Sequence, residues 1–349
     1  MTIATQTLDN PRAWLRSGGF DGLLIFGVAA LALASGAVVV ADPGLFPIVL
    51  LVDLWFLGYH HVVSTFTRLA FDSESFASHR FLVIWLPLLV LAAVMLSVLA
   101  LGGWILSTTY LYWQWFHYTR QSYGIERAYR RKSGDAAVGD QRLTRWALYL
   151  VPLWGILYRS YQAPSEFLGL ELKVLPVSRV VVLSSGAVAA VAMAWWLWGL
   201  ARSLAAGRPL QGHSLYVISH AVIFVVGYVA IEDIDNGWLV LNVWHNAQYI
   251  LFVWMFNQNR FGDGVDPKHW FLSTLSQRRN WPYYFLTCVL ISTAVYKGLE
   301  HGLEALVVYS ALPLVLVAYQ TINFHHYIVD GLIWKMRKKP LRKTLGIEE

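Results

Sequence analysis

Residues 81–102, FLVIWLPLLVLAAVMLSVLALG, carry no charged side chain. A helix needs about 20 apolar residues to cross the roughly 30 Å of hydrocarbon in a bilayer. This stretch therefore predicts a transmembrane helix. Apolar runs of similar length recur along the whole chain, so we expect an all-α integral membrane protein.

The composition supports the same class. The chain has 349 residues, of which 57% are hydrophobic and 14% charged, whereas soluble domains are about 25% charged. The longest polar segments, 127–145 and 259–281, are too short to fold alone. We therefore expect a single membrane domain over residues 1–349, with short tails at 1–19 and 336–349. About ten transmembrane helices are predicted, at residues 20–41, 45–67, 81–102, 104–126, 146–161, 177–201, 214–231, 237–258, 282–299 and 305–334.

The distribution of basic residues predicts the orientation, because cytoplasmic loops are enriched in Lys and Arg. With both termini in the cytoplasm, all but four of the 27 Lys and Arg residues fall on that side. The four exceptions are Arg159, Lys173, Arg179 and Lys297. The basic clusters RAYRRKSG (127–134) and KMRKKPLRK (335–343) lie beside predicted spans, where they attract anionic lipid. We expect the lipid bilayer, and not nucleic acid, as the partner, in a bacterial inner membrane.

Histidines are the most informative polar residues of the predicted spans. Ionisable groups inside a membrane are costly and usually face the interior of the helix bundle. Six of the eleven histidines fall on four spans, in the half nearer the cytoplasm. We predict that they hold a metal: His60, His61, His117, His245, His325 and His326.

Polar neighbours accompany these histidines on the same helix faces, because residues three or four apart lie on one side of a helix. A metal-bound imidazole usually donates its second N–H to such a group. Asp330 follows His326 by four positions and is expected either to orient it or to bind metal itself. Asp53 is a second candidate carboxylate, for which a helix-packing hydrogen bond is an equal alternative. The remaining predicted supporting residues are Gln121, Gln248 and His220.

Histidine and carboxylate groups without thiolate favour iron, zinc, copper or manganese, and the lone Cys288 excludes a cysteine cluster within this chain. Aromatic residues around the histidines indicate a hydrophobic substrate, and this favours iron, as one or two non-haem ions. The predicted substrate-binding residues are Trp115, Tyr118, Trp244 and Tyr327, with Arg120 and Arg260 placed to bind an anionic group.

The paired histidines in FLGYHH (56–61) and TINFHH (321–326) resemble those of polytopic membrane non-haem iron enzymes. This class includes the histidine-box desaturases, hydroxylases and alkane monooxygenases and, more distantly, the bacterial carotenoid-cleaving dioxygenases. The pairs are present, whereas Leu57 and Ile322 stand where the desaturase-type HxxHH box has its first histidine. The resemblance implies an oxygen-dependent oxidoreductase that acts on a lipid or another hydrophobic substrate and takes electrons from an external donor.

Two other functions fit the same histidines. A pair of histidines facing each other can bind haem, which would indicate a haem- or quinone-linked electron carrier. Alternatively, histidines and aspartates could titrate in a proton-coupled transporter.

Overall fold

The structure is a computed structural model that describes residues 14–134, 137–307 and 313–347. These residues are almost entirely helical, which confirms the all-α class. A short antiparallel hairpin pairs β1 (Glu166–Phe167) with β2 (Leu170–Glu171). The longer α-helices are α3 (Val28–Ala41), α4 (Phe46–Asp53), α5 (Tyr59–Leu69), α6 (Ser73–Arg80), α7 (Leu86–Leu101), α8 (Trp104–Ser133), α9 (Gln141–Gln162), α10 (Arg179–Ala205), α11 (Gly212–Val225), α12 (Ile234–Arg260), α14 (Trp281–Val307) and α15 (Leu314–Ile333). The short ones are α2 (Gly18–Gly22), α13 (Trp270–Leu275) and α16 (Lys339–Thr344).

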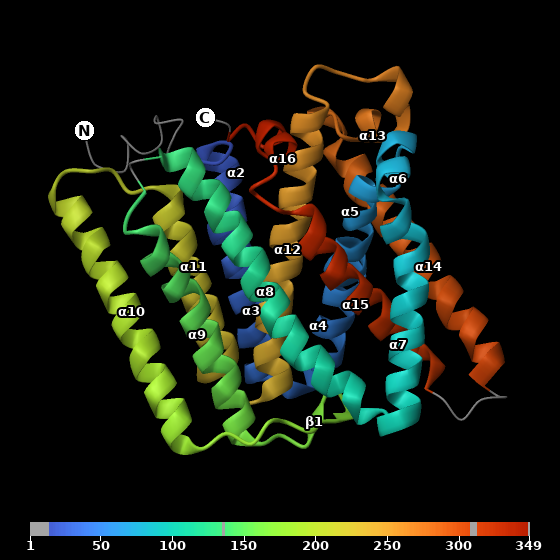
Figure 1. Ribbon diagram of the computed structural model, residues 1–349, viewed down its shortest axis with the longest axis horizontal. Coiled ribbons are helices and arrows are strands. Elements are labelled where there is room, and N and C mark those ends of the chain that lie inside the picture. Colours follow the sequence, from blue (N-terminus) through green and yellow to red (C-terminus); the bar gives the residue numbers. More distant parts are fainter. Residues whose placement is uncertain (1–13, 135–136, 308–312, 348–349) are drawn as a thin grey trace.

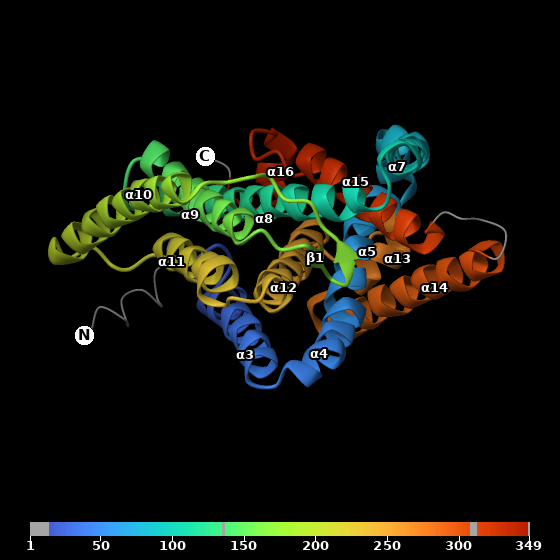
Figure 2. The ribbon, with the colours of Figure 1, turned by 90° about the horizontal axis from the view of Figure 1, so that it is seen from below.

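The long helices form one elongated bundle, with α10 on one flank and α14 on the other (Figure 1). Seen from below, α12 lies at the middle of the bundle, between α8 and α3 (Figure 2). Most residues of α12 are buried, and it packs against α3 and α5. The functional site is built around this central helix.

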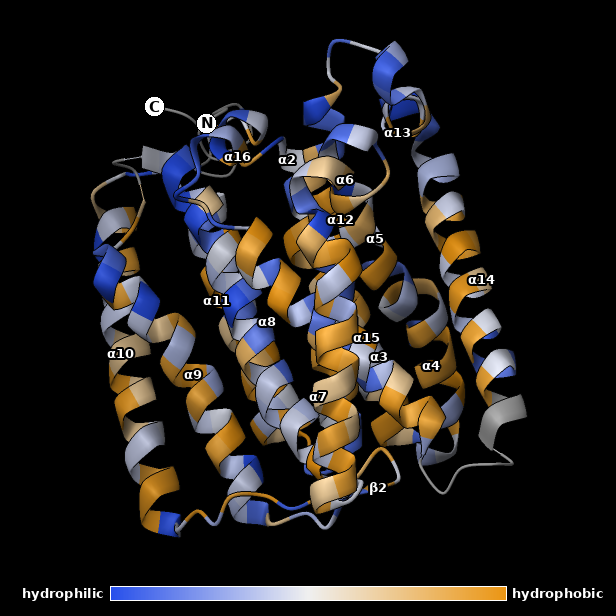
Figure 3. Cartoon of the chain, turned by 45° about the vertical axis from the view of Figure 1, so that its right-hand side comes forward, coloured by the Kyte–Doolittle hydropathy of each residue, from blue (hydrophilic) through white to orange (hydrophobic). Residues whose placement is uncertain are grey.

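Within the described residues, five helical segments are long and apolar enough to cross a membrane, which is compatible with an integral membrane protein. They are Gly18–Ala41, Pro43–Leu69, Ser73–Leu101, Arg179–Ala205 and Gly212–Ala230. Hydrophobic residues cover much of the length of these helices, and hydrophilic residues gather at the end with α6, α13 and α16 (Figure 3). The prediction of about ten spans is thus supported for five of them.

The other five predicted spans correspond to α8, α9, α12, α14 and α15, which run beside the apolar helices in the same bundle (Figure 1). They bring buried polar side chains to the interior, such as Gln114 on α8 and Asn242 on α12. Most of the predicted tail at 1–19 and residues 308–312 of the last predicted span lie outside the described residues.

Four π-turns interrupt the helices, at Leu23–Gly27, Leu54–Gly58, Phe81–Trp85 and Val226–Ala230. A π-turn bonds each residue to the fifth one along instead of the fourth, so it shifts the faces that the following helix presents. The turn at Leu54–Gly58 lies directly before α5, which carries the first histidine pair. The faces of α5 therefore cannot be extrapolated from α4.

A buried arginine holds α9 against the turn before α12. Arg159 is fully buried, and its guanidinium donates hydrogen bonds to the carbonyl oxygens of Gly227, Ile231 and Glu232. At Gly237 a Cβ would meet the Gly227 carbonyl oxygen at 2.1 Å and Arg159 Nη2 at 2.5 Å. Only glycine therefore fits this close approach.

Candidate metal centre

Four buried histidines from four different helices converge at the centre of the bundle. They are His61 on α5, His117 on α8, His245 on α12 and His326 on α15, and one ring nitrogen from each lies within 4.8 Å of those of the others. The sequence analysis predicted all four as ligands. The structure brings together four of the six predicted metal-binding histidines.

The rings of these four residues, called the histidine cluster below, meet edge to face. His61 lies 4.3 Å from His326 and 4.8 Å from His245 between ring centroids, at interplanar angles of 87° and 79°. His117 lies 4.9 Å from His245 and 5.1 Å from His326, at 69° and 76°. Steep angles of this kind allow several ring nitrogens to face a common point without the rings overlapping.

The nitrogens inside the cluster have no other hydrogen-bond partner among the described residues. This holds for Nε2 of His61, His117 and His326, and for both nitrogens of His245. A buried polar atom without a partner is costly and calls for a specific explanation. A cation at the centre would satisfy all four rings at once, so the cluster could hold a metal ion.

The distances fit an ion after a small adjustment. Two imidazole nitrogens bound on opposite sides of an ion at about 2.1 Å would lie about 4.2 Å apart. The widest separation in the histidine cluster is 4.8 Å. Small ring rotations would close this difference.

Asp330 lies on the same side of His326 as the ligand nitrogens. Its Oδ2 is 3.4 Å from His326 Nε2 and 3.9 Å from His117 Nε2. An orienting partner would instead sit at Nδ1, on the far side of the ring. Of the two predicted roles for Asp330, the geometry favours that of an additional ligand or a carboxylate facing the metal.

The orienting partner of His326 is Thr65, through a chain of hydrogen bonds that ends at Asp330. Tyr249 donates its only hydroxyl proton to Asp330 Oδ1 at 2.7 Å, and its oxygen accepts from Trp334 Nε1 at 3.0 Å. Thr65 Oγ1 lies 2.8 Å from the Tyr249 hydroxyl and 3.0 Å from His326 Nδ1.

These contacts assign the tautomer of His326. Because the Tyr249 proton goes to Asp330, Thr65 must donate to the Tyr249 oxygen. Thr65 then has no proton left and accepts one from Nδ1–H of His326. The lone pair of His326 is consequently on Nε2, which faces the histidine cluster.

Thr65, Tyr249 and Trp334 were not among the predicted supporting residues, although the sequence places Thr65 one turn beyond the first histidine pair. The spacing carries a signal for all three: Thr65 follows His61, Tyr249 follows His245 and Trp334 follows Asp330, each by four positions. Residues at this spacing share a helix face.

The structure does not bring His60 and His325, the other two predicted metal-binding histidines, into the histidine cluster. His60 meets the ring of Phe285 edge to face at 5.3 Å, and His325 Nε2 donates to the Leu82 carbonyl at 2.7 Å. Consecutive residues on an α-helix point about 100° apart. Only one histidine of each pair can therefore face the centre.

Three of the predicted supporting residues, Asp53, Gln248 and His220, bond to groups outside the histidine cluster. Asp53 accepts a hydrogen bond from Asn242 and takes no part in the cluster, which is the helix-packing role given above as an alternative. The π-turn between Asp53 and His60 explains why they do not share the expected face. Gln121 does lie near the site, where its Nε2 donates to the His245 carbonyl oxygen at 3.1 Å.

Gln248 and His220 bond to groups outside the histidine cluster. Gln248 Oε1 accepts from the Tyr216 hydroxyl at 3.1 Å. Its Nε2 donates to the carbonyl oxygen of Leu24, in the π-turn that precedes α3, at 3.4 Å. His220 uses both ring nitrogens, with Ser122 Oγ at 2.7 Å and the Leu148 carbonyl at 2.9 Å. In the structure these contacts join neighbouring helices of the bundle.

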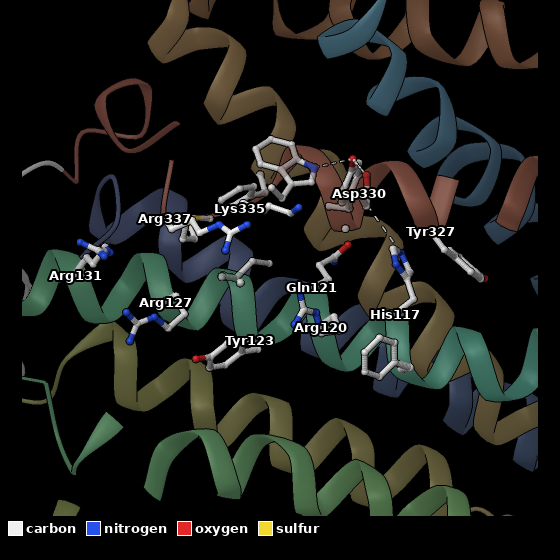
Figure 4. Close-up of a pocket in the computed structure, with 18 of the residues that line it drawn as sticks. His117, Arg120, Gln121, Tyr123, Arg127, Arg131, Tyr327, Asp330, Lys335 and Arg337 are labelled. Atoms are coloured by element: carbon white, nitrogen blue, oxygen red, sulfur yellow. Dashed lines mark hydrogen bonds and ion pairs between the residues drawn. The ribbon is translucent and has the colours of Figure 1, made fainter. Parts of the chain in front are cut away.

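A cavity of about 680 Å³ opens beside the histidine cluster and reaches His117 and Asp330 (Figure 4). Of the predicted substrate-binding residues, Arg120 and Tyr327 line it, and Tyr327 also stacks on His117 at 4.3 Å. Tyr118 instead stacks on His245, with ring centroids 4.0 Å apart. It also lines a second cavity of about 60 Å³, which is lined by three of the four cluster histidines as well.

Arg260, Trp115 and Trp244 do not line the large cavity. Trp244 is fully buried among the rings of the core, and Trp115 packs against the same core. Their aromatic character reflects helix packing, which the sequence could not separate from substrate contact.

Arg260 instead bonds to Asp72 at 3.0 Å, outside the apolar spans. Burial raises the pKa of the Asp72 carboxyl, but hydrogen bonds from Ser75 and Arg260 outweigh this and hold its pKa below the usual range. The predicted contact of Arg260 with a substrate is therefore replaced by an ion pair between helix ends.

Comparison with known proteins adds no relative. The sequence matches no protein-family model, and neither curated proteins nor solved structures show significant similarity to it. The functional argument accordingly rests on the site itself.

Proposed function

We propose that this protein is a membrane-bound, metal-dependent oxidoreductase that uses dioxygen at a non-haem iron site to act on a lipid or another hydrophobic substrate. The observation that carries the proposal is the histidine cluster with Asp330, open on one side to a cavity of about 680 Å³. Imidazole and carboxylate ligands with an accessible side are typical of non-haem iron enzymes.

A catalytic ion fits this site better than a structural one. Structural zinc is enclosed by four ligands in a tetrahedron, whereas catalytic ions keep a position open. Here a carboxylate oxygen stands 3.4 and 3.9 Å from two ligand nitrogens, beside the cavity. Five potential donors and an open side favour iron over zinc, and one ion over two.

The chain's own residues prepare the site for this chemistry. A bound iron ion would supply the activation of dioxygen, which protein side chains alone do not provide. Thr65 holds the His326 lone pair toward the ion, and Tyr327 supports the ring of His117. The aromatic side chains of Trp113 and Phe116 line the cavity together with His117, so they would pack against a substrate bound there. An external donor would supply the electrons.

The geometry disfavours the other two functions. A haem would need its macrocycle between two axial histidines, yet here four rings meet at centroid distances of 4.3 to 5.1 Å along the edges of the cluster. A proton pathway would be expected to distribute titratable groups across the membrane. In this chain four histidines from four helices are gathered around one point.

We also propose that α8, α9, α12, α14 and α15 cross the membrane together with the five apolar segments, in a bacterial inner membrane with both termini in the cytoplasm. Their polar residues can be accommodated because they face the bundle interior. The basic C-terminal turn of α8 supports this orientation. Lys132 Nζ there donates to the Gly346 carbonyl next to α16, so two basic segments share one end of the bundle.

Metal analysis of the detergent-purified protein tests the proposed function. We expect about one iron per chain and no Soret band in the absorption spectrum. His117→Ala, His245→Ala and His326→Ala should each lose the metal, because a missing ligand opens the coordination sphere. His269→Ala and His301→Ala should keep it, and so should the matched controls His60→Ala and His325→Ala. Equal metal content in all seven variants would refute the site.

A further inference from the structure

The cavity beside the histidine cluster has strongly segregated charge. Five cationic residues line it, and Asp330 is its single lining carboxylate among the described residues. In Figure 4, His117, Tyr327 and Asp330 lie at one end, while Arg127, Arg131 and Arg337 lie toward the other. The five cationic residues are Arg120, Arg127, Arg131, Lys335 and Arg337.

One helix sets the distance between the two ends. His117, Arg127 and Arg131 all belong to α8. With a rise of about 1.5 Å per residue, Arg127 lies about 15 Å along the axis from His117, and Arg131 about 21 Å. A ligand that bridges the two ends must therefore be long.

One hydrogen-bond donor at the cationic end of the cavity has no acceptor among the described residues. Nη1 of Arg127 is buried and has no hydrogen-bond partner among the described residues. A guanidinium presents a planar pair of donors that matches carboxylate and phosphate. The side chain as a whole is partly exposed, while this one enclosed nitrogen lies beside the cavity without an acceptor, so it suits an oxygen of an anionic ligand.

The walls between the two ends suit an apolar chain. They include the rings of Trp113, Phe116 and Phe252. Two glycines, Gly124 and Gly331, also line the cavity, and a Cβ added at either would meet no heavy atom within 4 Å. The volume of about 680 Å³ lies within the range of small-molecule sites.

We propose that this cavity binds an anionic amphiphile as the substrate, a single apolar chain that ends in a carboxylate or a phosphate. Its head group binds Arg127 and Arg131, and its chain extends along α8 to His117 and Asp330. The inference rests on the proposed function, because it assigns the substrate class of the same site. The fixed spacing implies that the metal acts on a bond far from the head group.

Binding to the metal-loaded protein in a non-ionic detergent tests this inference. The probes are dodecyl phosphate, dodecanoate, dodecanol and dodecyltrimethylammonium, which share one chain and differ in charge. We expect at least one anion to bind tenfold or more tightly than the alcohol, and the ammonium probe to bind more weakly still. The ratio of phosphate to carboxylate affinity identifies the head group. Equal affinity of the alcohol and both anions would overturn the proposal.

Two variants locate the ligand. Arg127→Gln should reduce the preference for the anion over the alcohol about tenfold. Gly331→Leu should weaken every chain probe, because the new side chain takes the space of the apolar chain. Gly298→Leu is the control, since Gly298 lies outside the cavity and its Cβ also meets no atom within 4 Å. Anion binding that survives Gly331→Leu would place the ligand on the surface and refute the inference.

Metal content is measured on the same samples. Arg127→Gln and Gly331→Leu should retain the metal of the parent protein. If metal is present but the anion shows no advantage, the substrate inference fails while the metal site stands. If no variant or parent binds metal, the proposed function fails independently of the cavity.

Discussion

Thr65→Val should weaken metal binding while the helix bundle stays folded. Valine has nearly the shape of threonine but lacks the hydroxyl that accepts the His326 Nδ1 proton at 3.0 Å and bonds to Tyr249 at 2.8 Å. Two buried hydrogen bonds of about 1 kcal/mol each are lost. Both bonds also exist in the metal-free protein, so their loss lowers the stability of both states, and metal binding suffers only because the His326 ring is no longer held in one direction and one tautomer. We therefore expect the affinity for iron to fall by roughly 10- to 100-fold, the range seen when residues that support metal ligands are changed.

The control for this variant is Thr67→Val on the same helix. Thr67 donates to the Ser64 carbonyl at 2.7 Å, accepts from Asn257 at 2.9 Å and lies 3.3 Å from the Tyr284 hydroxyl, so its hydroxyl is also buried and hydrogen-bonded. It contacts none of the cluster nitrogens. Both variants should lower the melting temperature of the metal-free protein, and only Thr65→Val should change the dissociation constant measured by chelator competition. An unchanged constant in Thr65→Val would refute the assigned tautomer and the hydrogen-bond chain.

Two further predictions concern the carboxylate and the membrane. Asp330→Asn should keep the hydrogen bond to Tyr249 but present an uncharged group to His117 and His326. The amount of metal per protein should therefore fall by more than in Thr65→Val. A full complement of metal with a lower melting temperature would show that Asp330 is only structural. Accessibility tags at the two termini and in the loop at 162–175 should report cytoplasm, cytoplasm and outside, and an outward terminus would contradict the ten-span topology.

Helix positions could be predicted closely where the hydrophobic pattern decides them. The span predicted at 237–258 corresponds to α12, Ile234–Arg260. The span predicted at 104–126 continues as a helix to Ser133, because the polar end of α8 is held by tertiary contacts that the pattern does not reveal. One of these is Glu126, which bonds to Arg130 at 2.9 Å and to His213 at 2.8 Å.

The sequence could predict which types of residue form the candidate site, but not which of their side chains face the interior of the bundle. Sequence spacing identifies helices with histidine pairs, yet it cannot say which member of a pair turns inward. The π-turn before α5 changes the face of everything that follows it, and such turns have no simple signature in sequence. The chain through Thr65 and Tyr249 also joins different helices, so only the packing of α5, α12 and α15 reveals it.

Arg159 has a consequence for how the chain assembles. It is one of the few basic residues predicted on the outer side, and its guanidinium bonds to Gln162 on its own helix and to carbonyl groups that lie 68 to 73 residues later in the sequence. During synthesis α9 therefore emerges before any of these carbonyl groups exists. An unpaired arginine inside a membrane costs about 2.5–3.5 kcal/mol on the scale of cellular insertion. We therefore expect the outer end of α9 to complete its contacts only after α11 and the turn that follows it have been made, so that a later segment of the chain fixes an earlier helix.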